Sequence, residues 1–228
     1  MLKQFNTSVY RNEIFQLAFA ILFAAAMGIL EAICVIYIRD ILPSWYNYTY
    51  PVAPLKSLPY ELIREASTLV MLLTVAWLAG FNMRSRVYYF FIMFGVWDIL
   101  YYGGLKFWLD WPATWMSWDC LFLIPEPWYA PVLAPVLISV YFIAGGTLLL
   151  LVERLVSNAR IHLVTILLNL AAFGIWYWSF VQNTSTIHSK GYRGVEYSWI
   201  FFMAGFLLGN AGIIYSVIRN YRYPAFKK

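Results

Sequence analysis

The sequence predicts an all-α fold, a polytopic membrane bundle of six transmembrane helices with a Trp-rich loop between the third and fourth. Two observations lead to this class. Hydrophobic residues make up 62% of the chain and charged residues only 12%, whereas about 25% charged is usual in soluble domains. Six stretches also reach the roughly 20 apolar residues that a helix needs to cross a bilayer. Because backbone groups in lipid must be satisfied within their own segment, we expect each stretch to be helical.

The expected spans cover residues 15–38, 59–80, 87–107, 129–152, 161–181 and 199–218. They leave room for one integral membrane domain, residues 1–228. Lys3 and Arg11 precede the first span, as in a signal peptide. The 15–38 run exceeds the roughly 7–15 residues of a typical signal-peptide core, so we interpret it as a retained first span.

The basic residues are unevenly divided between the two sides of the predicted bundle. Six spans place both termini on one side, which holds ten of the sixteen Lys and Arg residues. The positive-inside rule therefore predicts cytoplasmic termini. This preference accounts for the net charge of +5 without a nucleic-acid partner; the expected partner is the lipid bilayer. Nine of the eleven Asp and Glu residues fall toward the other, outer side.

The loop after the third span is unusually rich in tryptophan. Trp108, Trp111, Trp115 and Trp118 lie within it, and an apolar run follows from 118 to 124. This run is too short to cross the membrane, and the prolines at 125 and 127 stop any helix there. We therefore expect a re-entrant or interfacial segment.

Five carboxylates are expected at or near the outer end of the bundle: Glu31, Glu61, Glu65, Asp98 and Asp119. An ionisable group within a span costs about 2.5–3.5 kcal/mol on insertion scales, which marks it as a functional-site hypothesis. Helical spacing places Glu61, Arg64 and Glu65 on one face. The same spacing places Asp98, Tyr102 and Lys106 on one face of the third span, with Tyr101 beside them.

Three functional interpretations remain open. A hard cation such as Mg²⁺, Ca²⁺ or Mn²⁺ would use carboxylate oxygens; the candidate ligands are Glu31, Glu61, Glu65 and Asp98. Acid–base catalysis on a lipid or small molecule is the second; the candidates are Glu65, Asp98, Asp119, Lys106 and Tyr102. Transport of an ion or protons is the third. Candidate substrate contacts are Arg64, Arg39, Tyr101 and Trp118. No diagnostic motif decides between transport and catalysis, so enzymatic activity stays undecided.

The alternative is structural. The same acids can pair with Arg39, Arg64 and Lys106 to fix helix packing in an accessory subunit of a larger membrane complex. Gly205 and Gly209 give the sixth span a small-residue face, suited to packing within the bundle or to a homo-oligomer or larger complex.

Haem is not expected. The only histidines, His162 and His188, fall at opposite membrane faces in the predicted topology and cannot ligate one iron. Cys34 and Cys120 both fall on the outer side. We expect them to be unpaired small apolar residues rather than a disulfide.

Four segments carry a resemblance: Leu30-Glu31-Ala-Ile-Cys-Val-Ile-Tyr-Ile-Arg39, Arg64-Glu65-Ala-Ser-Thr-Leu-Val-Met-Leu72, Trp97-Asp98-Ile-Leu-Tyr-Tyr102 and Trp118-Asp119-Cys-Leu-Phe-Leu-Ile-Pro-Glu-Pro-Trp128. Together they resemble a family of bacterial multi-pass membrane proteins of no known activity. The resemblance covers about the first four spans. It implies a bacterial inner membrane, draws attention to the same polar residues, and carries over no catalytic role.

Overall fold

The computed structural model describes residues 7–41, 58–156 and 158–222. Its elements follow in the order α1 (Thr7–Ile41), α2 (Leu58–Ala79), α3 (Met83–Leu109), β1 (Trp118–Phe122), β2 (Trp128–Pro131), α4 (Leu133–Leu155), α5 (Leu163–Val181), α6 (Thr184–Lys190) and α7 (Trp199–Arg222). Every helix except α6 is long and apolar enough to cross a membrane. The prediction of six helices able to span a membrane is therefore confirmed.

Three details differ from the expected elements. The fourth helix begins at Leu133 rather than near residue 129, because residues 128–131 form strand β2. The first helix is longer at both ends than the predicted span. Between the fifth and sixth predicted spans, where no element was predicted, the chain forms the short helix α6.

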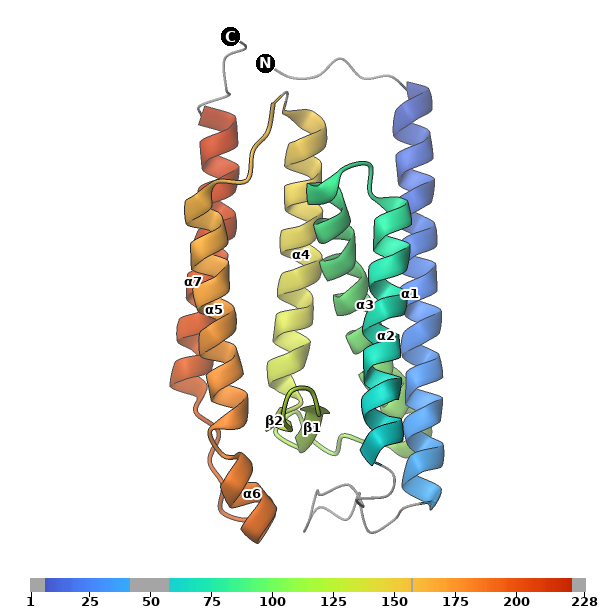
Figure 1. The fold of residues 1–228 in the computed structure, drawn as a ribbon, viewed down its shortest axis with the longest axis vertical. Coiled ribbons are helices and arrows are strands. Elements are labelled where there is room, and N and C mark those ends of the chain that lie inside the picture. The colour runs from blue at the N-terminus through green and yellow to red at the C-terminus, as the bar shows by residue number, and fades with distance from the viewer. Residues whose placement is uncertain (1–6, 42–57, 157, 223–228) are drawn as a thin grey trace.

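The helices form two groups joined through α4. In Figure 1, α1, α2 and α3 lie to one side and the pair α5 and α7 to the other. α1 packs on α3, α3 on α4, and α5 on α7, while α4 also contacts α7. α1 begins and α7 ends at the same end of the bundle (Figure 1), as an even number of crossings requires.

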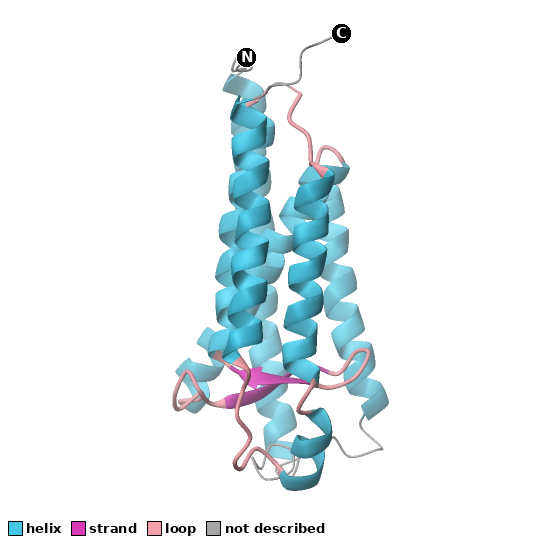
Figure 2. Ribbon diagram, turned by 90° about the vertical axis from the view of Figure 1, so that its left-hand side faces the viewer, coloured by secondary structure: helices cyan, strands magenta, loops and turns pink. Residues whose placement is uncertain are grey.

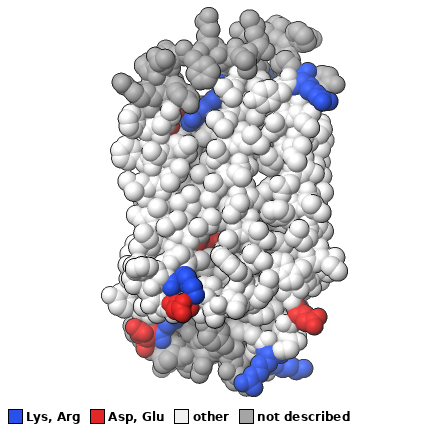
Figure 3. Space-filling model, turned by 180° about the vertical axis from the view of Figure 1, so that it is seen from behind, with Lys and Arg blue, Asp and Glu red and all other residues white. Residues whose placement is uncertain are grey.

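The outer surface of the bundle is apolar. Large side chains such as Leu78 and Ile200 are 77% and 85% exposed, which is the reverse of a soluble protein's surface. Figure 3 shows Lys, Arg, Asp and Glu mostly near the two ends of that face, with a broad uncharged band between them. This distribution supports a lipid bilayer environment.

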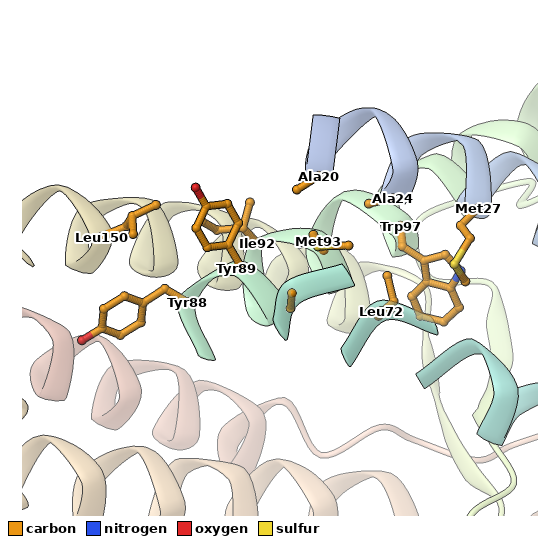
Figure 4. Packing of buried hydrophobic residues seen from close by; sticks show 11 residues of the cluster. Ala20, Ala24, Met27, Leu72, Tyr88, Tyr89, Ile92, Met93, Trp97 and Leu150 are labelled. Atoms are coloured by element: carbon orange, nitrogen blue, oxygen red, sulfur yellow. The ribbon is translucent and has the colours of Figure 1, made fainter. Parts of the chain in front are cut away.

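The core between α1, α2, α3 and α4 combines small and large side chains. Ala20 and Ala24 of α1 are almost fully buried beside Ile92 and Met93 of α3 (Figure 4). A β-carbon added at Gly28 would collide with the backbone carbonyl oxygen of Trp97. The small residues of α1 thus allow the close approach of the helix that carries Asp98 and Tyr102.

The start of α3 is fixed by a capping box. The side-chain oxygen of Asn82 accepts hydrogen bonds from the backbone N–H groups of Arg84 (2.9 Å) and Ser85 (3.0 Å), and the Ser85 hydroxyl oxygen accepts from the Asn82 N–H. These bonds satisfy otherwise unpaired N–H groups of the first turn. The Asn82 amide also donates to Glu153 of α4 at 2.8 Å, which ties the two helices together.

The loop expected to be re-entrant or interfacial is a β-hairpin. β1 and β2 are antiparallel, with Asp119 opposite Ala130 and Cys120 opposite Tyr129. Figure 2 shows the strands lying among the helices at the end opposite the termini. The chain between the strands contains Pro125 and Pro127, in agreement with the prediction that no helix forms there. Pairing between the strands satisfies backbone groups that a helix would have satisfied internally.

The glycine face of α7 packs inside the molecule. A β-carbon at Gly205 would lie 2.8 Å from the Trp176 indole, and one at Gly209 would lie 2.9 Å from the Tyr141 hydroxyl. Both glycines are buried against neighbouring helices of the same chain. The predicted use of this face within the bundle is observed, because side chains of α4 and α5 lie against it. Its suggested use in a homo-oligomer or larger complex stays a prediction.

Candidate functional site

A cavity of about 80 Å³ lies at the hairpin end, between α1, α2, α3 and β1. This is the region where the sequence analysis expected the outer carboxylates to converge. Its ionisable lining consists of Glu31, Glu61, Glu65, Asp119, Arg39 and Arg64. Tyr101 and Trp118, predicted as substrate contacts, also line it.

Helix α2 provides the largest share of the charged wall. Glu61, Arg64, Glu65 and Thr68 follow at helical spacing and therefore share one face. Arg64 Nε lies 2.9 Å from Glu61 Oε2, and the same guanidinium forms an ion pair with Glu31 of α1. Arg64 thus joins α1 and α2 in the wall of the cavity.

Glu65 links α2 to the hairpin. Its Oε2 accepts a hydrogen bond from the backbone N–H of Leu123 at 2.9 Å, and the residue is only 8% exposed. The N–H it satisfies belongs to the residue after β1, which lacks a strand partner in the hairpin register. A carboxylate on a helix therefore holds the edge of the hairpin against the cavity.

Asp119 enters the cavity from β1. The hydroxyl of Tyr102 donates a hydrogen bond to Asp119 Oδ2 at 2.9 Å in a buried environment. Burial raises the pKa of Asp119, while the positive charge of Arg39 and hydrogen bonds from Tyr102 and the Cys120 backbone act in the opposite direction. The Arg39 guanidinium itself lies 4.2 Å from the centre of the Trp111 ring, within cation–π range.

Asp98 does not line the cavity. The hydroxyl of Ser139 on α4 donates to its Oδ2 at 2.8 Å, and the residue is 8% exposed. Asp98 interacts electrostatically with Asp119 and Tyr102, so it lies behind the cavity wall. Two buried carboxylates from different elements are therefore each hydrogen-bonded to a hydroxyl group, Asp98 to that of Ser139 and Asp119 to that of Tyr102.

Lys106 points away from the site. Its Nζ lies 2.6 Å from Asp110 Oδ1 and 3.2 Å from the Pro112 carbonyl oxygen, and the side chain is about half exposed. The predicted stripe of Asp98, Tyr102 and Lys106 diverges because each step of four residues rotates by about 40° around a helix of 3.6 residues per turn. Lys106 instead accompanies the C-terminal end of α3.

The predicted metal site is not supported. Among the described residues, no group of three or more His, Cys, Asp and Glu side chains is placed to hold a metal ion. Arg64 occupies the position between Glu31 and Glu61 that a cation would need, and Asp98 is bound to Ser139 instead. The four proposed ligands therefore do not form one coordination sphere.

Several residues of the site were not predicted. Trp97 and Trp111 line the cavity, each less than a tenth exposed, and their indole nitrogens have no hydrogen-bond partner among the described residues. Tyr192, which follows α6, stacks on Trp118 with ring centres 5.7 Å apart. The cluster of tryptophans in the loop could have identified Trp111 as a residue of the site. The sequence near Tyr192 contains no comparable pattern.

Of the remaining sequence candidates, Cys120 lines the cavity, whereas Cys34 and the two histidines do not. His188 Nε2 lies 2.9 Å from the Tyr129 hydroxyl at the hairpin end, while His162 contacts Tyr215 near the opposite end. Cys34 and Cys120 are free thiols.

Comparison of this chain with protein-family models, curated proteins and solved structures finds no match. The resemblance noted from the sequence therefore stays a prediction, and the function must be argued from the site.

Proposed function

We propose that this protein is an integral membrane protein whose cavity faces the non-cytoplasmic side and binds a cation or a small polar molecule. The observation that carries the proposal is the lining: four carboxylates and two guanidiniums enclose one cavity inside an apolar bundle. Placing so many ionisable groups at the end of membrane spans is costly, and such groups usually serve a function.

The orientation follows from the charges. Six arginines with described side chains lie at the end where α1 begins and α7 ends: Arg84, Arg86, Arg154, Arg160, Arg219 and Arg222. Lys3, Lys56, Lys227 and Lys228 lie outside the described residues. The positive-inside rule assigns this end to the cytoplasm and the cavity to the other side. With the resemblance to bacterial proteins, the proposed location is the bacterial inner membrane.

The cavity lies at the hairpin end of the bundle, lined by β1 and the residue that follows it. Between it and the cytoplasmic end, the bundle is filled by a cluster of buried apolar side chains that includes Leu72, Ile92, Met93 and Leu150 (Figure 4). This arrangement supports binding or catalysis at the outer face over an open pore. The Asp119–Tyr102 pair would serve such a site as a proton donor and acceptor.

Carboxylate-to-amide substitutions test the site. Glu65→Gln and Asp119→Asn should remove activity in a cell phenotype while the protein still accumulates in the membrane. Glu126→Gln is a matched control, because Glu126 accepts a hydrogen bond from Tyr177 (2.7 Å) on the exposed side of the hairpin, outside the cavity. If the two cavity variants behave like this control, the proposed site is wrong.

The second candidate function is an accessory subunit, and the ion pairs between helices favour it. Arg64 joins α2 to α1, and Arg154 of α4 lies 3.2 Å from Glu13 of α1. Arg84 of α3 lies 2.9 Å from Glu153 of α4. If the charges only fix packing, cavity variants would abolish accumulation of the protein, and a stoichiometric partner would copurify with the wild type.

A further inference from the structure

We propose that the end of the bundle where α1 begins and α7 ends binds the phosphate group of an anionic phospholipid, held between Arg160 and Arg219 with His162 beside them. This inference is independent of the function proposed for the cavity, because it concerns the opposite end of the molecule. The excess of positive charge, the placement of Arg160 and the apolar surface next to the arginines each support it.

This end of the bundle carries an excess of positive charge. Six arginines with described side chains lie there, against the two carboxylates Glu13 and Glu153, which leaves a net charge of +4. Both carboxylates already form ion pairs within the bundle, Glu13 with Arg154 at 3.2 Å and Glu153 with Arg84 at 2.9 Å. The sequence before Glu13 and after Arg222 adds Lys and Arg and no Asp or Glu. Anionic head groups of a bilayer are attracted to such a surface.

The short chain between α4 and α5 holds Arg160 beside the end of α7 (Figure 1). The side-chain oxygen of Asn220 accepts a hydrogen bond from the Arg160 backbone N–H at 2.8 Å, and its amide donates to the Arg160 carbonyl oxygen at 3.0 Å. Asn220 is buried, whereas the Arg160 side chain is exposed. Because these bonds use only the backbone of Arg160, they position the residue and leave its guanidinium available for a ligand.

Arg219 and His162 lie next to this arginine. Arg219 precedes Asn220 on α7, and its side chain is exposed. Burial and then the charges of Arg219 and Arg160 lower the pKa of His162, so both arginines are close enough to act on one imidazole. The His162 ring also contacts that of Tyr215 on α7, with ring centres 5.9 Å apart. Basic side chains from two elements therefore gather at one place, and an anion bound there would relieve the repulsion between them.

The surface adjoining these groups is apolar, which favours a lipid over a soluble phosphate. Leu163 and Val164, which follow His162, are 68% and 43% exposed. Ile214 and Ile218, near the end of α7, are 54% and 46% exposed. Because α5 and α7 pack on each other, the charged groups at this end adjoin exposed hydrocarbon on both helices. An anionic phospholipid has the matching distribution, with a phosphate next to its acyl chains, and basic pockets between spanning helices bind such head groups.

The test measures the dissociation constant of the first bound lipid by native mass spectrometry of the purified full-length protein in detergent. Phosphatidylglycerol should bind saturably, and phosphatidylcholine, which has no net charge, should bind about tenfold more weakly. Arg160→Gln should raise the dissociation constant for phosphatidylglycerol about fivefold, the usual contribution of one arginine next to anionic lipid. The double variant Arg160→Gln, Arg219→Gln should raise it about 25-fold.

Arg193→Gln is the matched control, because it removes one exposed arginine from the chain that follows α6, at the opposite end of the molecule. Charges further apart than a Debye length are largely screened, so its dissociation constant should stay within about twofold of the wild type. The single variant Arg160→Gln keeps the backbone bonds to Asn220. It therefore tests the site even if the double variant fails to fold.

A competition experiment distinguishes a lipid from a soluble phosphate. Glycerophosphoglycerol is deacylated phosphatidylglycerol and carries the same phosphate diester without acyl chains. At the concentration at which phosphatidylglycerol half-saturates the protein, it should displace little of the bound lipid. Displacement of half of the lipid at that concentration would show that the site takes a soluble phosphate, and the proposal of a lipid would be wrong.

Two further results would overturn the inference. One is equal affinity for phosphatidylglycerol and phosphatidylcholine. The other is an affinity of Arg160→Gln for phosphatidylglycerol that equals that of Arg193→Gln, because the basic groups at the end of α7 would then play no part in binding. Neither result would bear on the cavity at the hairpin end.

Discussion

Replacing Arg64 by methionine would leave two carboxylates without their common partner. Arg64 forms ion pairs with Glu31 of α1 and Glu61 of α2, and the side chains of these acids are only 12% and 10% exposed. Arg64 itself is 24% exposed, so the network is largely shielded from solvent. Methionine retains most of the aliphatic volume and removes the charge, which isolates the electrostatic contribution.

The expected loss of stability is about 3–5 kcal/mol, the usual cost of removing one partner from a buried ion pair. Since 1.4 kcal/mol corresponds to a factor of ten, about 3 kcal/mol would raise the unfolding equilibrium constant by roughly 150-fold. The triple variant Arg64→Met, Glu31→Gln, Glu61→Gln leaves no uncompensated charge. It should recover most of the loss, because replacing a whole buried network is often nearly neutral.

The assay is reversible unfolding in mixed micelles of increasing SDS content, followed by far-UV circular dichroism. Lys106→Met is a suitable control, because its partner Asp110 is exposed and such pairs contribute little; we expect no measurable change. A stability of Arg64→Met within about 0.5 kcal/mol of wild type would refute the reasoning, since that is the range of an ordinary surface substitution. So would a triple variant no more stable than the single one.

Three further predictions follow. Gly205→Ala should destabilise the protein by about 1–3 kcal/mol, because its β-carbon meets the Trp176 indole at 2.8 Å. The control Gly174→Ala has open space around it and should be neutral or slightly stabilising in the same unfolding assay. Equal effects of the two substitutions would contradict this packing. Burial raises the pKa of Asp119 above its ordinary 3.8, so the folded state binds more protons than the unfolded state and stability falls as pH rises from about 4 through the raised pKa. Asp119→Asn should flatten this dependence in thermal midpoints measured from about pH 4 to 7, and an unchanged slope would count against it. The proposed orientation places the C-terminus in the cytoplasm. A green fluorescent protein fused there should therefore fluoresce, and an alkaline phosphatase fused there should be inactive. The reverse pattern would show that the orientation is inverted.

The sequence alone was sufficient for the six long apolar helices and for several residues that line the cavity. Hydrophobic length and helical period are local properties, so they identified six helices without knowledge of their neighbours. The same local spacing predicted that Glu61, Arg64 and Glu65 share one face, and all three line the cavity. The prolines at 125 and 127 likewise excluded a helix, although they did not indicate that a hairpin would form.

Only the tertiary structure decided which charges meet. Asp98 binds Ser139, 41 residues further along the chain, and Tyr192 reaches the cavity from the other half of the bundle by stacking on Trp118. Lys106 turns outward because the rotation of α3 accumulates along its length. A local pattern fixes the direction of a side chain relative to its own helix, but not the neighbour that this direction faces. That neighbour is set by the packing of distant elements. Among the four proposed metal ligands, Glu31 and Glu61 pair with Arg64, Glu65 binds the Leu123 N–H, and Asp98 binds Ser139.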